Sequence, residues 1–288
     1  MNARRAYVLA ATLFAAMVGV STEQALGQSS IRRGAESADW GGELRFAATN
    51  ILLSGAVATL IAALRDDVTV AEAFPTAAAG GAVVYLGKRV AVARFTGAGL
   101  LGRQVASMGA SIGRNAGNGR GPLDELVFPV GIGRLYWDRA TKRVALRPDL
   151  STIGLTVSAA LESGLTLDWS RSLSAGTPVF LLSDATLGEN VAGRAVGNVI
   201  LADPLAQSPL DDVLAHERVH VLQLDQHFTL WGDALEEWAV GLLGARSARL
   251  AGHVDLVVPT MLVGVGVSAL WSSGRNPLES EAQFLHRR

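Results

Sequence analysis

The chain has 288 residues, enough for one large domain or two smaller ones, and a formal net charge of −1 at pH 7. This charge balance excludes a general electrostatic affinity for nucleic acid. Hydrophobic residues make up 49% of the chain, charged residues only 18%, and the mean hydropathy is +0.30. So apolar a composition predicts contact with a membrane or a partner. Cysteine is absent, so a metal site must use His, Asp or Glu.

The N-terminus has the pattern of a secretory signal peptide. Arg4 and Arg5 precede the apolar run 6–20, and small residues follow before Gln28. This order predicts a signal peptide over residues 1–27. An uncleaved membrane anchor is the alternative, but about 15 apolar residues are short against the roughly 20 that a span requires. We therefore expect an exported protein of the periplasm or cell envelope.

Residues 40–120 are rich in Ala and Gly and are predicted to be mainly helical. The segment 46–64 is apolar almost throughout and could cross a membrane, but its small side chains equally suit a buried helix. The segment 73–123 contains six basic residues and no acidic one. It could therefore contact anionic lipid headgroups, although a solvated face is the simpler interpretation.

A glycine pattern in the same region suggests a second type of site. Gly97, Gly99 and Gly102 form a GxGxxG sequence between a predicted strand and a predicted helix, the context of a dinucleotide-binding turn. The region is rich in glycine generally, no second β-α unit follows, and the nearest later acidic residue is Asp124. Close packing of helices is therefore the better interpretation.

Residues 124–202 consist of short apolar runs separated by Gly, Pro, Asp or Asn. Partial alternation of apolar and polar residues predicts strands, among them TIGLTVSAAL, LTLDWSRSL and AVGNVILADP. No helix-length period interrupts these runs, so we expect an antiparallel meander and no parallel sheet.

Helix signals return at Ser208, a predicted N-cap followed by Pro209 at the first helical position and by two acidic residues. A second helix is predicted over 230–251. The apolar stretch 256–271 contains a proline and is predicted to be buried or to dip into a membrane.

The first of these helices contains the sequence HERVH, which has the elements of a hydrolytic zinc site. His216 and His220 lie four residues apart, so their imidazoles share one helix face and can bind the same ion. Glu217 beside them can take a proton from a water on that ion. Zinc lowers the pKa of bound water to about 7, which makes it the expected metal. Histidines that serve only the structure of a helix are the alternative.

A catalytic zinc site needs a third protein ligand and leaves one position open. Metzincins carry a third histidine where this chain has Gln226, so that class is disfavoured. The remaining candidates are carboxylates: Glu236 and Glu237 in the second helix, and Glu279 or Glu281 in NPLESEA.

With these residues the chain resembles the gluzincins, zinc metallopeptidases in which a glutamate on a later helix completes HExxH. HERVHVLQ together with NPLESEA is similar to largely uncharacterised bacterial exported proteins that pair HExxHxxQ with an NPxExEA segment. The resemblance covers roughly residues 196–285. It implies a zincin-like C-terminal part, a peptide or protein substrate, Glu279 as the third zinc ligand and Glu217 as general base.

Several further residues are candidates for supporting roles. Gln223, one turn beyond His220, could orient a ligand or substrate, or cap the buried face. His227, another turn on, could donate a hydrogen bond to a metal ligand, or it could simply be a partly exposed helix histidine. The predicted strand AVGNVILADP is a candidate to pair with extended substrate. Asn198 and Asp203 could touch the site, although a plain strand and turn is the simpler interpretation.

Gluzincins also use a His or Tyr to stabilise the oxyanion, and His253 and Tyr136 qualify by residue type alone.

Taken together, these segments predict an α+β fold with three parts: an Ala/Gly-rich helical N-terminal region over 40–120, an antiparallel β middle, and a C-terminal zincin-like helical part. The β meander and HExxH helix would share one domain over 124–288. The predicted function is an exported zinc metallopeptidase; the alternative is a non-catalytic envelope protein with a structural or metal-stabilised helix.

Overall fold

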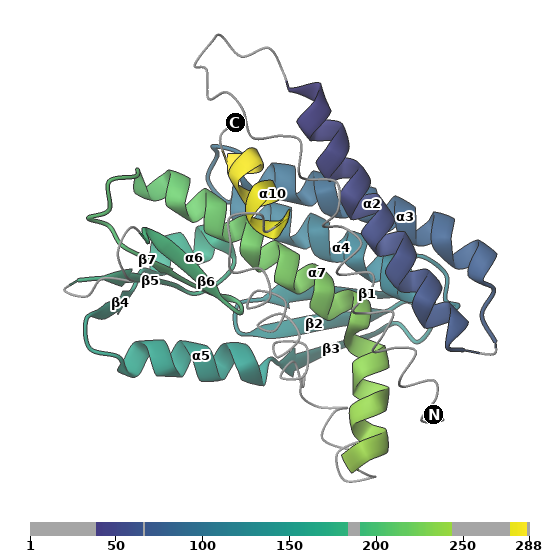
Figure 1. Ribbon diagram of the computed structural model, residues 1–288. Helices are drawn as coiled ribbons and strands as arrows, with labels where there is room; N and C mark the ends of the chain where they lie inside the picture. Colours follow the sequence, from purple (N-terminus) through teal and green to yellow (C-terminus); the bar gives the residue numbers. More distant parts are fainter. Residues whose placement is uncertain (1–38, 66, 184–190, 244–276, 287–288) are drawn as a thin grey trace.

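The computed structural model describes residues 39–65, 67–183, 191–243 and 277–286 (Figure 1). Seven helices and seven strands lie in these residues, in an order that confirms the predicted α+β fold class. The predicted signal peptide 1–27, the apolar stretch 256–271 and His253 lie outside the described residues.

Three long helices form the N-terminal region, as predicted: α2 (Trp40–Ala63), α3 (Val70–Ala91) and α4 (Ala98–Gly117). They lie side by side in Figure 1. Asp39 caps α2, because its carboxylate accepts a hydrogen bond from the backbone N–H of Gly42 at 3.0 Å. The cap fixes where the first helix of this layer begins.

Close packing of helices accounts for the glycine pattern: Gly102 lies against α3, and Gly99 lies against the backbone of Ser174 and Ala175. A Cβ atom on Gly102 would overlap with the backbone nitrogen of Ala91, and one on Gly87 would overlap with that of Ala106. Gly97 occupies the N-cap of α4 with a φ of 83°, a conformation that glycine adopts without strain. These glycines therefore allow two backbones to approach closely and start a helix.

Two of these helices are long and apolar enough to cross a membrane, judged by length and composition. The most apolar 18-residue stretch has a mean hydropathy of 1.8 in α2 and 1.2 in α3. Of these stretches, 44% and 33% are buried inside the protein. The buried face of α2 includes Val57 and Ile61, which pack against Leu230 and Trp231. Length and composition alone do not distinguish a membrane span from such a core helix.

The β region consists of two sheets. The first is an antiparallel meander, as predicted, of β1 (Glu125–Val130), β2 (Gly133–Asp138) and β3 (Arg143–Pro148). The second has the order β4-β5-β7-β6 and is made of β4 (Leu165–Leu167), β5 (Val179–Leu182), β6 (Gly193–Val196) and β7 (Val199–Ala202). Strands β5 and β7 run parallel, so this second sheet is mixed and is not the antiparallel meander that we expected over the whole β region.

Two of the predicted strands are wholly or partly helical. TIGLTVSAAL lies in helix α5 (Leu150–Leu161), and LTLDWSRSL divides into β4 and helix α6 (Trp169–Ala175). The physical reason is capping: the side chains of Asp149 and Asp168 accept hydrogen bonds from the first turn of each helix. In the sequence these aspartates resembled separators between strands.

The predicted strand AVGNVILADP is instead the greater part of a hairpin. Val196 of β6 pairs with Val199 of β7, which leaves Gly197 and Asn198 as a two-residue turn. Gly197 has a φ of 58°, as the first turn position of a tight hairpin requires. As a result β6 lies at one end of the strand order.

The two C-terminal helices predicted around the HExxH motif are one continuous helix, α7 (Leu210–Leu243). The helix begins one residue later than predicted, and its first described turn includes a hydrogen bond from Val213 N–H to the carbonyl of Pro209. Its second half continues because Leu230 and Trp231 are buried.

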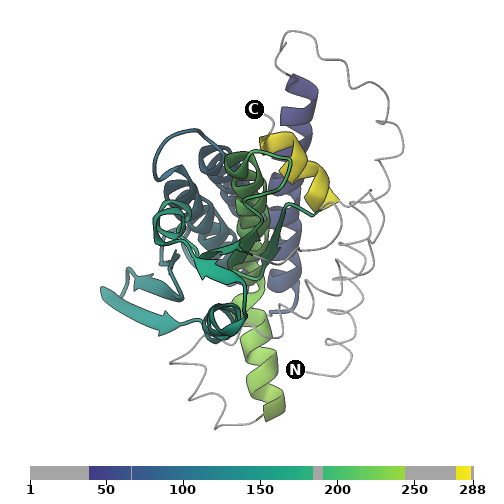
Figure 2. The same ribbon diagram turned by 90° about the vertical axis from the view of Figure 1, so that its left-hand side faces the viewer.

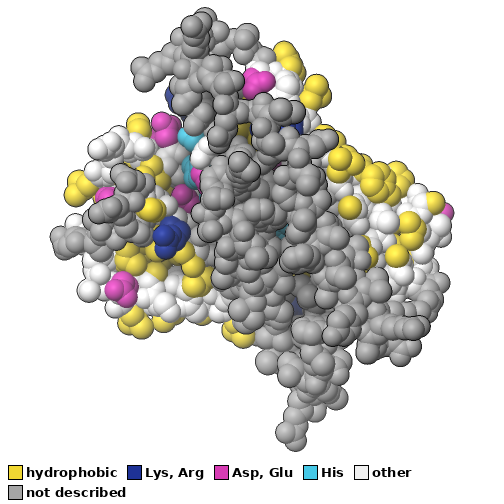
Figure 3. All heavy atoms as spheres, in the orientation of Figure 1, with side chains coloured by type: hydrophobic (Ala, Val, Ile, Leu, Met, Phe, Trp, Pro, Cys, Tyr) yellow, Lys and Arg dark blue, Asp and Glu magenta, His cyan; other side chains and the backbone are white. Residues whose placement is uncertain are grey.

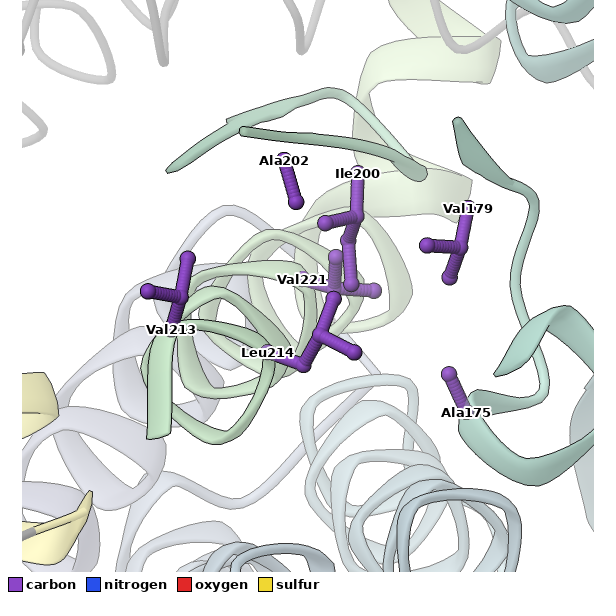
Figure 4. Close-up of a cluster of buried hydrophobic side chains, with 7 residues drawn as sticks. All are labelled: Ala175, Val179, Ile200, Ala202, Val213, Leu214 and Val221. Carbon is purple, nitrogen blue, oxygen red and sulfur yellow. The ribbon is translucent and has the colours of Figure 1, made fainter. Parts of the chain in front are cut away.

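One side of α7 packs beneath the second sheet, and helix α10 (Pro277–His286) lies on another part of its surface. The seven side chains drawn in Figure 4 form the contact with the sheet: Ala175, Val179, Ile200, Ala202, Val213, Leu214 and Val221. Val219 packs against Ala282 and Leu285 of α10. Figure 2 shows α10 beside both α7 and α2. This packing sets the positions of the HExxH residues relative to the C-terminal glutamates.

Candidate metal centre

Three predicted ligands from two helices converge at one point. Nε2 of His216 and Nε2 of His220, both on α7, lie 3.1 Å apart. Glu279 of α10 places Oε2 3.0 Å from Nε2 of His220 and Oε1 3.2 Å from Nε2 of His216. Each residue offers a ligand atom within 4.8 Å of the others, so the group can hold a metal ion.

The spacing of these atoms fits a small tetrahedral ion. Metal–ligand bonds of about 2.0–2.1 Å place neighbouring ligands of a tetrahedron about 3.3–3.4 Å apart. The two imidazole nitrogens lie 3.1 Å apart, close to this value, and each has a different oxygen of the Glu279 carboxylate 3.0–3.2 Å away. Side-chain exposures of 17% for His216, 21% for His220 and 38% for Glu279 leave the group within reach of water. Figure 3 shows histidine atoms at the surface beside acidic side chains.

The electrostatics of the group favour an ionised carboxylate between two imidazoles. Hydrogen bonds from His216 and then from His220 hold the pKa of Glu279 far below its ordinary value. Burial opposes protonation of His220, but the hydrogen bond with Glu279 and the charge of Glu217 raise its pKa overall. Since a metal binds only the deprotonated rings, metal binding should release protons and weaken in acid.

Each of the two candidate histidines has a neighbour at its other ring nitrogen. Nδ1 of His220 lies 2.9 Å from Oε1 of Gln223, and Nδ1 of His216 lies 3.3 Å from Nδ1 of His286. Partners in these positions orient the imidazoles of metal sites. Gln223 thus lies where its amide holds the orientation of the His220 ring.

His286 was missed in the sequence analysis. It lies on α10 seven residues after Glu279, a spacing of two helical turns that puts both side chains on one face. That spacing was the available signal, and it becomes informative once a helix over NPLESEA is assumed.

Glu217, the predicted general base, is only 6% exposed. Burial raises its pKa, although the neighbouring His220 and His216 and a backbone hydrogen bond from Ala195 act in the opposite direction. The β6 backbone comes close here: a Cβ on Gly193 would lie 3.1 Å from Cγ of Glu217. Gly193 therefore allows the strand to pass against the helix, a function that its sequence context did not indicate.

The other candidate ligands point elsewhere or are not described. Glu237 is exposed and lies 3.4 Å from Arg65, while the side chain of Glu236 lies outside the described residues. Glu281 is 5% exposed and forms an ion pair of 2.9 Å with Lys88. Among the described residues, the group that can hold a metal includes Glu279 and neither Glu237 nor Glu281.

The remaining candidates are distributed over other parts of the fold. His227 is half-buried, and desolvation and the charge of Lys88 lower its pKa to about 4. The ring of Tyr136, in the first sheet, faces the guanidinium of Arg147 at 4.3 Å. Asn198 belongs to the β6–β7 turn, and Asp203 accepts a hydrogen bond from the backbone of Leu205. These contacts are those of structural side chains.

No known family, curated protein or solved structure matches this chain. Its chemistry is therefore inferred from the residues and geometry given above.

Proposed function

We propose that this protein is a zinc-dependent peptidase, with His216, His220 and Glu279 as ligands. The observation that carries the proposal is the convergence of two imidazole nitrogens and one carboxylate, 3.0–3.2 Å apart, from two different helices. Two histidines and a glutamate form one of the ligand sets of catalytic zinc sites, which keep the fourth position for water or substrate. A zinc ion held there would act as a Lewis acid and lower the pKa of its water to about 7.

Glu217 would serve as the general base and later as the proton donor to the leaving amine. Burial raises its pKa, which favours uptake of a proton from a metal-bound water. Gly193 and Ala195 of β6 pack on one side of this carboxylate. The side chain is therefore enclosed, which limits its movement during proton transfer.

Strand β6 would bind the substrate in an extended form. It lies at the end of the strand order β4-β5-β7-β6, and Ala195 donates its backbone N–H to Glu217. The edge of β6 that does not pair with β7 is therefore the edge beside the general base. A peptide added to this edge would gain main-chain hydrogen bonds and bring its scissile bond near Glu217.

Zinc content and the Glu217→Gln variant test the proposal together. We expect one zinc per purified chain and hydrolysis of unstructured peptide substrates. Glu217→Gln should retain zinc and lose activity by about 10²- to 10⁴-fold, the usual contribution of a general base. Wild-type activity in this variant would show that the base is misassigned.

We also propose that the protein is exported and acts in the cell envelope. The support is the N-terminal pattern of residues 1–27, together with two apolar helices of spanning length. Mass spectrometry of the protein from fractionated cells should find an N-terminus at Gln28. A cytoplasmic protein that retains residues 1–27 would contradict this assignment.

A second function, a metal-stabilised protein without catalysis, is favoured by the position of Glu279. Two buried apolar residues of α10, Ala282 and Leu285, pack on Val219 of α7. A metal bound by Glu279 and the two histidines would fasten α10 to α7 and stabilise the fold. In that case zinc would raise the melting temperature while the wild-type protein cleaved no peptide.

A further inference from the structure

A buried cation on α3 is linked to the metal centre by a chain of hydrogen bonds. Lys88 is 2% exposed, and its Nζ lies 2.9 Å from Oε2 of Glu281 and 2.8 Å from Oδ1 of Asn50. An ammonium group can be buried to this extent only when it is paired and hydrogen-bonded. Lys88 and Asn50, which also contact each other, therefore hold the Glu281 carboxylate in position.

Charge and hydrogen-bonding capacity allow only one direction of donation at Glu281. An ammonium group only donates and a carboxylate only accepts. Oε1 of Glu281 receives Nδ2 of Asn50 at 2.6 Å, and Oε2 receives Nε2 of Gln223 at 2.8 Å in addition to Lys88. Three donors thus converge on this carboxylate, and the NH₂ end of the Gln223 amide has to face it.

The orientation of the Gln223 amide determines which ring nitrogen of His220 carries a proton. Its NH₂ group also donates to the carbonyl oxygen of Leu278 at 2.9 Å, so its Oε1 is left facing Nδ1 of His220. An amide oxygen only accepts, and Nδ1 must therefore carry the proton. Nε2, 3.0 Å from Oε2 of Glu279, is then the nitrogen whose proton a bound metal ion would displace.

We propose that Lys88 is a positioning residue of the metal centre, which fixes the Nδ1–H tautomer of His220 through Glu281 and Gln223. The inference rests on the metal site of the proposed function but not on peptidase activity. It gives α3 a role at a site whose three ligands come from α7 and α10.

The Lys88→Met variant tests this link, because it keeps the length of the side chain and removes the ammonium group. Zinc affinity, measured by competition with a chromophoric chelator, should fall by about 10- to 100-fold, as for the loss of other outer partners of metal ligands. Arg114→Met is the matched control. Arg114 is another buried cation, 4% exposed, and it pairs with Glu125 and, at 3.2 Å, with Asp233. This variant should lose stability and retain its zinc affinity within twofold.

The tautomer itself provides a readout that a merely structural ion pair would not change. The tautomer is read in a zinc-free Glu279→Ala background, because Glu279 would otherwise compete as the acceptor at Nε2 of His220. With ¹⁵N-labelled histidine, at a pH where the ring is neutral, His220 should there show a protonated Nδ1 and a bare Nε2. Adding Lys88→Met should produce a mixture of tautomers, and adding Arg114→Met should not. If Lys88→Met does not fold, Gln223→Met interrupts the same chain one step later and should lower zinc affinity to a similar extent.

The outcomes separate this inference from the proposed function. Unchanged zinc affinity and an unchanged His220 tautomer in folded Lys88→Met, or unchanged affinity in Gln223→Met, would overturn the role of Lys88 alone. Zinc binding by the wild type without peptidase activity would overturn the proposed function and leave the role of Lys88 standing. A wild-type chain that binds no zinc would overturn both.

Discussion

Nε2 of His220 lies 3.0 Å from Oε2 of Glu279, although 59 residues separate the two in the chain. Apolar packing of Val219 against Leu285 joins the same two helices and uses neither of these side chains. The fold therefore brings the candidate ligands together by burying apolar surface, and a bound metal would add to an arrangement that already exists. Removal of one ligand should then affect metal binding more than folding.

Glu279→Ala should strongly reduce zinc affinity, because it removes a direct ligand. The loss should exceed the factor of about 10 to 100 that is typical when a residue that hydrogen-bonds to a metal ligand is removed. The matched control is Glu237→Ala, since Glu237 lies on the exposed surface 3.4 Å from Arg65. Exposed ion pairs contribute about 0–1 kcal/mol, so this control should bind zinc as the wild type does. Chelator competition measures both variants. A larger loss in Glu237→Ala than in Glu279→Ala would place the third ligand on α7.

His286→Phe should weaken zinc binding by about 10- to 100-fold while the fold is retained. The ring of His286 packs edge-on against that of His216, with centroids 5.1 Å apart, and phenylalanine can keep this packing. The variant removes Nδ1 of His286, which lies 3.3 Å from Nδ1 of His216 and 3.0 Å from the carbonyl oxygen of Ala282. Calorimetric titration with zinc checks the affinity, with His227→Phe as the control for a histidine-to-phenylalanine change outside the ligand group. Equal affinities in the two variants would exclude an orienting role for His286.

Gly102→Ala should destabilise the protein by about 1–3 kcal/mol, because its Cβ would overlap with the backbone of Ala91 across the α3–α4 contact. Gly154→Ala is the matched helical control: nothing lies within 4 Å of its Cβ position, so it should stabilise α5 by about 0.4–1 kcal/mol. Urea unfolding measures both changes. Should Gly102→Ala instead leave stability unchanged, close packing would no longer explain this glycine.

The parts of the fold and site that could be predicted from the sequence are those encoded by local patterns. His216, Glu217 and His220 share one helix turn, and Pro277 opens the short helix that carries Glu279. Composition was sufficient to predict a mainly helical region over 40–120, but not the number of helices in it. The aspartate caps of α5 and α6 are also local, but an aspartate before an apolar run precedes a helix in one context and separates strands in another.

What could not be predicted depends on contacts between distant residues. Lys88 and Glu281 are 193 positions apart, and each alone resembles an ordinary surface charge. The parallel pairing of Val179 with Ile200 has no signal in either strand, because both are short apolar runs that fit an antiparallel partner equally well. The close passage of Gly193 beside Glu217 likewise arises only after β6 and α7 have packed.

His227 should make stability depend on pH in mildly acidic solution. Burial and the positive charge of Lys88, opposed by Glu281, lower its pKa from 6.5 to about 4 in the folded protein. The unfolded chain, with its ordinary pKa, binds the proton first, so folding is favoured by the full amount above pH 6.5. That stability is lost as the pH falls through 6.5 toward 4, by at most about 1.4 kcal/mol per pH unit for one proton.

A His227→Gln variant isolates this contribution, because it has no titrating group and keeps a polar side chain at the same position. Urea unfolding of both proteins, in the presence of a chelator that removes any bound metal, gives the difference between their unfolding free energies at each pH. The other histidines and Glu281 titrate in both proteins, so their contributions largely cancel in this difference. We expect the wild type to lose stability relative to the variant as the pH is lowered from 6.5 toward 4. A difference that stays constant over this interval would mean that His227 takes up its proton equally readily in the folded and unfolded chains, and that neither burial nor Lys88 disfavours its charge.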